Sequence, residues 1–160
     1  MHIFCDDRGR SAMSLFDHIT ALGDAQFNAS TMYAGAVKAW HRHFRQTDHW
    51  CVLSGNMKIG LFNSEPDPIV ATLRLATAAP NGEAVRSLTI ESGKGVAVYL
   101  GEHRPGVLCI PPKLWHGGVA CGGEDALLLY YVTRKYDPAD PDEERTGWDA
   151  YDFDWNVEFK

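Results

Sequence analysis

Three histidines and one tyrosine are the residues of this sequence whose types and spacing most clearly suggest chemistry. His41 and His43 stand two apart in the segment WHRHFRQTD, so on a strand both imidazoles face the same side of a sheet. His116 ends a second apolar segment, IPPKLWHGG, and Tyr130 is followed directly by Tyr131, so that one of the two phenols must face inward. If these segments line one barrel, their side chains converge in a single cavity.

These residue types support two kinds of chemistry. In the first, imidazoles and a carboxylate hold a metal ion such as zinc, iron, nickel or manganese. In the second, no metal is needed: a histidine with a pKa of about 6.5 removes a proton, and a tyrosine with a pKa of about 10 returns one. The residues alone leave both open, beside a purely structural role at the rim of a barrel.

The elements expected to position these residues are short strands. Apolar or alternating segments are separated by turns rich in Gly, Pro and Asn, which is typical of an all-β sandwich or barrel. Strands do not alternate with helices, which argues against a parallel α/β sheet. The expected strands are Ala36–Trp40, Trp50–Leu53, Met57–Phe62, Ala71–Leu75, Val85–Ile90, Val96–Leu100, Val107–Ile110 and Ala126–Thr133.

The two ends of the chain are less regular. Residues 1–35 contain one candidate helical stretch, Ser14–Leu22, and otherwise read as extended or irregular. From Tyr136 the chain is acidic and punctuated by proline, and we expect it to pack over the barrel as a tail. Its closing aromatic residues are Trp148, Tyr151, Phe153 and Trp155.

Length and composition fit one globular domain over residues 1–160. The chain has 15 Lys+Arg and 21 Asp+Glu, a formal charge of −6 at pH 7, and 45% hydrophobic residues. This acidic balance argues against a nucleic-acid-binding scaffold but allows a ligand the size of a nucleotide. No apolar run reaches the roughly 18–20 residues of a membrane span, and no secretory leader is visible. Because the four cysteines are scattered, we expect free thiols and a cytoplasmic protein.

The histidine segment resembles the first cupin signature. His41-x-His43 is followed after four residues by Asp48, where glutamate is usual, and after six more by Gly55. His116 stands where the second cupin signature has its histidine. This resemblance implies a metal site in which His41, His43, Asp48 and His116 are the ligands.

Over nearly its whole length the chain also resembles the dTDP-4-dehydrorhamnose 3,5-epimerase family. The resemblance implies an all-β fold, a cupin-type double-stranded β-helix (jelly roll) with short helical segments near the termini. It rests on DDRG at Asp6–Gly9, QFNAS at Gln26–Ser30, VKAWH at Val37–His41, Ser54-Gly55, IPPKLWHG at Ile110–Gly117, LYYVTRKYDP at Leu129–Pro138, and Glu144-Arg145 followed by Trp148-Asp149.

The same resemblance implies an activity and its catalytic residues. His41 would be the general base and Tyr130 the general acid of an epimerase that needs no cofactor. The substrate would be a nucleotide-activated 4-keto-6-deoxy sugar, inverted at carbon 3, carbon 5 or both through an enolate. His116 would help to hold the substrate or its developing oxyanion.

Binding residues and an assembly follow from the resemblance too. Arg8, Gln26 and Asn28 would contact the nucleotide diphosphate, and the family's homodimer would let Arg8 reach in from a neighbouring subunit. Lys38 stands where the family has an arginine, which keeps the charge but loses the bidentate fork. Tyr136 would border the sugar pocket.

Three features depart from the family pattern. Asp48 stands where the family has a lysine near the ketone oxygen, and a carboxylate there would destabilise an enolate unless it is turned away or bound to a cation. The aspartate that partners the family's catalytic histidine is not visible, and Asp48 or Asp154 could substitute for it. Ser11 and Met13 replace a phenylalanine and an acidic residue.

These departures keep two alternatives open beside the epimerase. One is a metal-dependent cupin enzyme that uses all four side chains of the cupin signatures. The other is a non-catalytic cupin that binds a sugar nucleotide.

Overall fold

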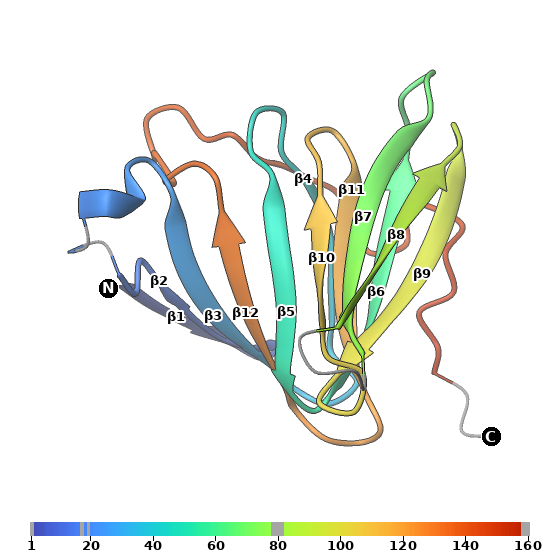
Figure 1. Cartoon of the computed structure of the whole chain (residues 1–160), viewed down its shortest axis with the longest axis horizontal. Helices are drawn as coiled ribbons and strands as arrows, with labels where there is room; N and C mark the ends of the chain where they lie inside the picture. Colours follow the sequence, from blue (N-terminus) through green and yellow to red (C-terminus); the bar gives the residue numbers. More distant parts are fainter. Residues whose placement is uncertain (1, 17, 19, 78–81, 158–160) are drawn as a thin grey trace.

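Two antiparallel sheets face each other in the computed structural model, which describes residues 2–16, 18, 20–77 and 82–157 (Figure 1). The larger sheet has the order β1 (His2–Asp6), β2 (Gly9–Met13), β3 (Gln26–Met32), β12 (Ala126–Val132), β5 (Asp48–Ser54), β10 (Gly106–Ile110), β7 (Ile69–Ala76) and β8 (Glu83–Ile90). The smaller sheet has the order β13 (Glu144–Arg145), β4 (Val37–Arg42), β11 (Trp115–Cys121), β6 (Asn56–Asn63) and β9 (Lys94–Gly101). This is the predicted all-β jelly roll.

The predicted strands are all present, and the differences concern the N-terminal segments, the glycine-rich β11 and the short β13 of the tail. The stretch 14–22 was expected to be helical. Among its described residues, which leave out 17 and 19, the helical structure is a single 3-10 turn, η1 (Thr20–Leu22). The irregular first 35 residues form β1, β2 and β3. Among the described residues no helix has the length and apolar character of a membrane crossing.

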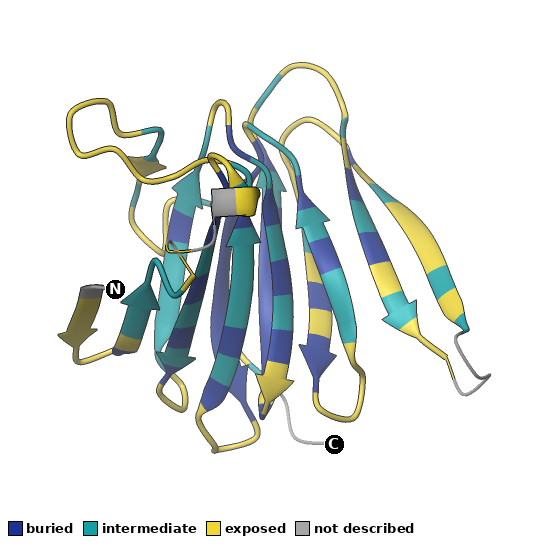
Figure 2. Cartoon of the chain, turned by 60° about the vertical axis from the view of Figure 1, so that its left-hand side comes forward, coloured by how far each residue is buried: buried dark blue, intermediate teal, exposed yellow. Residues whose placement is uncertain are grey.

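Strand alternation separates the interior from the outer faces, and Figure 2 shows the resulting buried and exposed stripes. Along β3 and most of β5 every second residue is buried. The interior side of β3 is polar at Gln26, Asn28 and Ser30, and apolar only at Met32. The apolar core therefore fills only part of the space between the sheets, around buried residues such as Ile59 and Leu108.

Strand β11 was not predicted because two glycines interrupt its apolar pattern. A Cβ at Gly117 would lie 2.4 Å from the Ala39 side chain, and one at Gly118 would lie 2.7 Å from the end of Met57. Glycine at these positions thus lets β11 fit between β4 and β6. This packing also sets the position of His116, the residue before Gly117, between β4 and β6.

An aromatic tail covers the outer face of the smaller sheet, as expected. Trp40 packs against Trp155 and Phe153, with ring centroids 4.8 and 5.2 Å apart. The indole N–H groups of Trp40 and Trp155 both donate to the carbonyl of Trp148 at 3.1 Å. The Trp148 side chain itself is 59% exposed, so only its backbone takes part in this cluster. All four cysteines are free thiols, as predicted.

Removing the Trp155 ring should destabilise the protein far more than removing the Trp148 ring. We expect Trp155→Ala to lower the free energy of unfolding by about 3–5 kcal/mol, because it empties a packed site and loses a hydrogen bond. Trp148→Ala keeps the accepting carbonyl and should cost less than about 1 kcal/mol. Urea denaturation followed by circular dichroism measures both, and equal losses would contradict the packing described.

Candidate functional site

A cavity of about 670 Å³ lies between the two sheets beside the apolar core. Lys38 and His41 line it from β4, while Asn28, Asp48 and Tyr130 line it from β3, β5 and β12 of the other sheet. The imidazole and phenol that the sequence singled out thus share one enclosed space, contributed by opposite sheets.

A bulge in β4 turns both Lys38 and His41 into this cavity. His41 pairs with His116 and Lys38 pairs with Gly118, so three steps along β4 match two along β11. Simple alternation would place residues three apart on opposite faces, and the extra residue in β4 corrects this. The loop of residues 43–47 then crosses from β4 to β5 in the other sheet, which brings Asp48 back to face His41.

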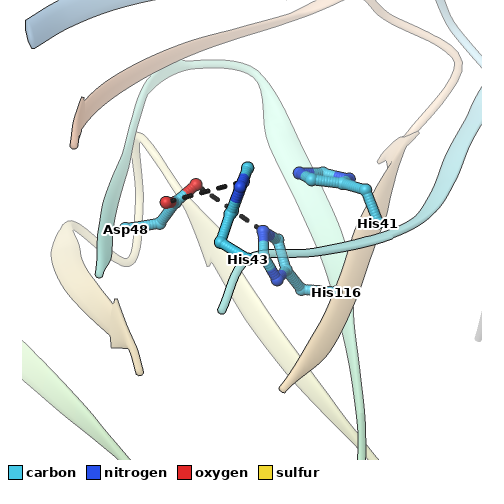
Figure 3. Close-up of side chains that lie close together, drawn as sticks. All are labelled: His41, His43, Asp48 and His116. Carbon is cyan, nitrogen blue, oxygen red and sulfur yellow. Dashed lines mark ion pairs between the residues drawn. The ribbon is translucent and has the colours of Figure 1, made fainter. Parts of the chain in front are cut away.

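His41, His43, Asp48 and His116 form a compact cluster (Figure 3). Each offers one nitrogen or carboxylate oxygen, and these atoms all lie within 4.8 Å of one another. His41 and His116 are closest, with ring centroids 4.1 Å apart. Nε2 of His43 lies 3.9 Å from Asp48 Oδ1, and Nε2 of His116 lies 3.6 Å from Asp48 Oδ2. Both separations exceed a hydrogen bond.

Hydrogen bonds orient three members of the cluster. His43 Nδ1 contacts the backbone carbonyl of Asp142, and His116 Nδ1 contacts that of Leu114 at 2.9 Å. Because a carbonyl oxygen only accepts, each Nδ1 must carry a hydrogen. The Asp48 oxygens accept from the Gln46 amide at 2.6 Å and the Trp50 indole at 3.1 Å.

His41 differs from the other two histidines. Its ring has no hydrogen bond within the part of the chain that the structure describes, and it lines the cavity, whereas His116 is 1% exposed and packs behind it. Burial and the neighbouring imidazoles of His116 and His43 hold the pKa of His41 well below its ordinary value. The His41 ring is therefore neutral at neutral pH.

The two other titratable groups of the cavity are shifted in opposite directions. Burial raises the pKa of Asp48, but the facing imidazoles of His116, His43 and His41 outweigh it, and the net pKa lies far below the usual range. Burial and the nearby carboxylates of Asp48 and Glu143 raise the pKa of Tyr130. The site thus holds an ionised carboxylate and a protonated phenol.

Five of the six predicted binding residues line the same cavity: Arg8, Gln26, Asn28, Lys38 and Tyr136. The sixth, His116, is buried and does not line it. Gln26 donates to Asn28 Oδ1 at 2.7 Å and accepts from the Tyr136 backbone N–H at 3.1 Å. Lys38 contacts the Ser30 hydroxyl and the Thr31 carbonyl, and burial lowers its pKa. Arg8 pairs with Asp6 near the surface.

Asp154 is not at the cluster; it lies on the tail, 3.9 Å from Lys58 Nζ. Of the two aspartates considered as partners of the histidine, Asp48 is therefore the one that lies beside the imidazoles. Ser11 and Met13 line the cavity, where Met13 Sδ accepts from the Tyr130 hydroxyl at 3.2 Å.

Three residues of the site were not predicted from the sequence. Trp50 and Gln46 stand two positions from Asp48 on either side, a spacing that could have suggested that they share its face. Asp142 has no such signal. Its carboxylate accepts the consecutive backbone N–H groups of Phe44, Arg45 and Gln46 at 2.9–3.0 Å, which fixes the loop between β4 and β5.

A polar cavity between the sheets of a jelly roll defines a cupin-type protein, and comparison with known proteins narrows the class. No protein-family model matches the chain. It is 35% identical over 132 residues to a probable low-salt glycan biosynthesis epimerase, Agl13, of Haloferax volcanii, covering 81% of this chain and 71% of the relative. It is 29% identical over 163 residues to the spore coat polysaccharide biosynthesis protein SpsL of Bacillus subtilis, covering 97% and 91%.

Solved structures show the same fold. The dTDP-4-dehydrorhamnose 3,5-epimerase of Elizabethkingia anophelis superposes with a TM-score of 0.62 at 17% identity, covering 98% of this chain and 79% of that one. The capsular polysaccharide assembling protein CapF of Staphylococcus aureus superposes with a TM-score of 0.61 at 18% identity. The match covers 90% of this chain but 33% of CapF, so the chain spans about a third of that protein. The chain belongs to the family of the glycan biosynthesis epimerase of Haloferax volcanii, and it has the cupin-type fold of the dTDP-4-dehydrorhamnose 3,5-epimerases.

Loss of the Asp142 carboxylate should loosen the loop that carries His43. We expect Asp142→Ala to lower the free energy of unfolding by about 1–3 kcal/mol, because three backbone donors lose a charged acceptor. Asp140→Ala is the matched control, since Asp140 is exposed and pairs only with Arg45. Thermal unfolding compares the two, and an unchanged midpoint for Asp142→Ala would refute the role given to this carboxylate.

Proposed function

We propose that the protein epimerises a nucleotide-activated 4-keto-6-deoxy sugar at carbon 3, carbon 5 or both, in the biosynthesis of a deoxysugar or polysaccharide. The observation that carries this proposal is the placement of His41 and Tyr130 on opposite sheets around one cavity. Membership of the epimerase family and the glycan-biosynthesis names of two relatives support it.

Inversion next to a ketone needs a proton acceptor and a proton donor on opposite faces of the sugar. A C–H bond beside the ketone is acidic because its conjugate base is an enolate. A ring bound between the sheets would present one face to His41 and the other to Tyr130. A well-placed acid or base is worth about 10²–10⁴ in rate.

The state of each side chain suits its proposed role. His41 is neutral and its ring is not engaged by a hydrogen bond among the described residues, so that a nitrogen lone pair is available to accept the proton. Tyr130 is kept protonated by burial, so its phenol can deliver a proton to the opposite face. His41 would then release its proton to solvent and the Tyr130 phenolate would take one up, so that both groups return to their starting states.

The cavity also suits an anionic nucleotide, although the whole chain is acidic. Arg8, Lys38, Arg134 and Arg145 contribute four cationic side chains to its wall. The buried Asn28 Nδ2 has no hydrogen-bond partner among the described residues, so a donor is available for a phosphate or sugar oxygen. We propose that Arg8, Gln26, Asn28 and Lys38 contact the nucleotide diphosphate and that Tyr136 borders the sugar. In a homodimer, the exposed Arg8 could serve a neighbouring subunit.

Proton exchange tests these roles directly. With dTDP-4-keto-6-deoxyglucose in deuterated water, wild type should incorporate deuterium beside the ketone, as read by NMR. His41→Asn and Tyr130→Phe should each slow this inversion-linked exchange by about 10²–10⁴. Tyr131→Phe is the control, because Tyr131 faces the other side of β12 and packs on Phe27.

Two outcomes would count against the proposal. If both variants keep wild-type exchange, His41 and Tyr130 do not have these roles. If wild type binds the sugar nucleotide but exchanges no proton in it, the protein is a binding cupin rather than an epimerase.

A further inference from the structure

The short strand β13 brings an arginine of the tail back beside His41. It pairs antiparallel with β4, so that Arg145 stands opposite His41 and Glu144 stands opposite Arg42. Side chains opposite each other in an antiparallel pair lie on the same face, with Cβ atoms about 4.5–5.5 Å apart. Arg145 therefore faces the cavity next to His41, and both residues line it.

Contacts on the other face of β13 and along its backbone hold this register. The Glu144 carboxylate accepts a hydrogen bond from Arg42 Nε at 2.7 Å. Arg42 also donates to Glu65 at 2.9 Å, so its guanidinium is itself held in place. The backbones of Trp40 and Thr146 exchange two hydrogen bonds, at 3.1 and 3.3 Å. The arginine of β13 thus projects into the cavity from an anchored strand.

Inside the cavity Arg145 has a partner that a ligand can replace. Its Nε lies 2.6 Å from Glu143 Oε1. The Arg145 side chain is 70% exposed, and an ion pair this open to water adds little stability. The guanidinium has further N–H donors in a fixed planar fork, which suits an oxygen that carries negative charge. A substrate that enters the cavity can therefore compete for this side chain.

The other cations of the cavity wall are directed elsewhere. Lys38 contacts a hydroxyl and a carbonyl of β3, and Arg8 forms an ion pair on the hairpin of β1 and β2. Arg134 acts on the tail: the pKa of Asp140 is lowered by its hydrogen bond from Arg45 and also by the charge of Arg134.

The charge of Arg145 acts instead on the proposed acid and base. Burial and Asp48 are the main causes that raise the pKa of Tyr130, Glu143 raises it further, and Arg145 lowers it. Arg145 also adds to the effects of burial and of the neighbouring imidazoles, which lower the pKa of His41. Its guanidinium thus lies within electrostatic range of both groups that would contact a bound sugar.

Inversion through an enolate needs a positive charge near the ketone oxygen. When His41 takes the proton from the carbon next to the ketone, the C–H electron pair forms a carbon–carbon double bond and negative charge develops on that oxygen. The carboxylate of Asp48 lines the same cavity and cannot supply the charge. Because the ketone is bonded to the carbon that loses its proton, its oxygen would lie beside His41, where Arg145 stands.

We propose that the bound substrate displaces Glu143 from Arg145, whose guanidinium then donates hydrogen bonds to the ketone oxygen and stabilises the enolate. When Tyr130 returns a proton to the opposite face of the carbon, the double bond reverts to the ketone and the charge on the oxygen disappears. Arg145 transfers no proton in either step. This inference rests on the proposed function and adds to it the group that holds the ketone oxygen.

Replacement of the guanidinium should slow the reaction and spare nucleotide binding. With dTDP-4-keto-6-deoxyglucose in deuterated water, Arg145→Gln should lower kcat for deuterium incorporation by about 10²–10³, the usual cost of one oxyanion donor. Its Kd for dTDP, which has no ketone, should stay within about threefold of wild type, because an interaction made mainly in the transition state changes kcat. Arg104→Gln is the matched control, since Arg104 is exposed and lies outside the cavity wall.

Chemical rescue separates a catalytic role of Arg145 from a structural one. Arg145→Ala should keep the wild-type unfolding midpoint, because the side chain that it removes is exposed. Guanidinium ion, at concentrations that leave the fold intact, should restore part of the lost exchange rate. Urea at the same concentrations is the control, because it has a similar shape and no charge.

Three results would overturn this role while the proposed function stands. The first is wild-type exchange by Arg145→Gln. The second is a loss of dTDP affinity as large as the loss of rate, which would assign Arg145 to the diphosphate. The third is an equal response of Arg145→Ala to urea and to guanidinium ion. If wild type binds the keto sugar nucleotide but exchanges no proton, the proposed function itself fails, and the role of Arg145 fails with it.

Discussion

The site depends on a buried, ionised carboxylate that faces three imidazoles across the interface of two sheets. Asp48 reaches this position because the loop of residues 43–47 leaves the smaller sheet and enters the larger one. Desolvation of such a charge costs several kcal/mol unless hydrogen bonds and positive charge compensate. Gln46 and Trp50 supply two N–H donors. The imidazoles of His41, His43 and His116 lie beside the same carboxylate, so the burial of this charge and the arrangement of the site depend on each other.

Replacement of one residue type changes what the family's cavity can do. In the family that the sequence resembles, a lysine near the ketone oxygen could stabilise an enolate by its own charge. In this chain the carboxylate of Asp48 lies in the cavity, and His43 and His116 converge on it. A buried carboxylate alone is costly, whereas this one is surrounded by two hydrogen-bonded imidazoles and two N–H donors. The three residues therefore make physical sense as a group rather than as independent departures.

Sequence patterns predicted the positions of the strands better than the directions in which their side chains point. Apolar alternation located eight strands, but β11 was missed because Gly117 and Gly118 have no side chain to contribute to the pattern. A period of two places Lys38 and His41 on opposite faces, and only the bulge against β11 brings both inward. His41 and His43 do converge, yet His43 lies beyond the end of β4 and is held by the distant Asp142. Contacts of this range leave no local signal.

The two sheets contribute different side chains to the cavity, and the proposed function depends on this division. The smaller sheet supplies His41 and His116, while the larger one supplies Asn28, Tyr130 and the Asp48 carboxylate. In the proposed function, a sugar ring bound between the sheets would be contacted on its two faces by residues of different strands. The pairing of β3, β12 and β5 holds Asn28, Tyr130 and Trp50 side by side. Strand register and the spacing of the two sheets together set the separation between Tyr130 and His41, the proposed proton donor and acceptor.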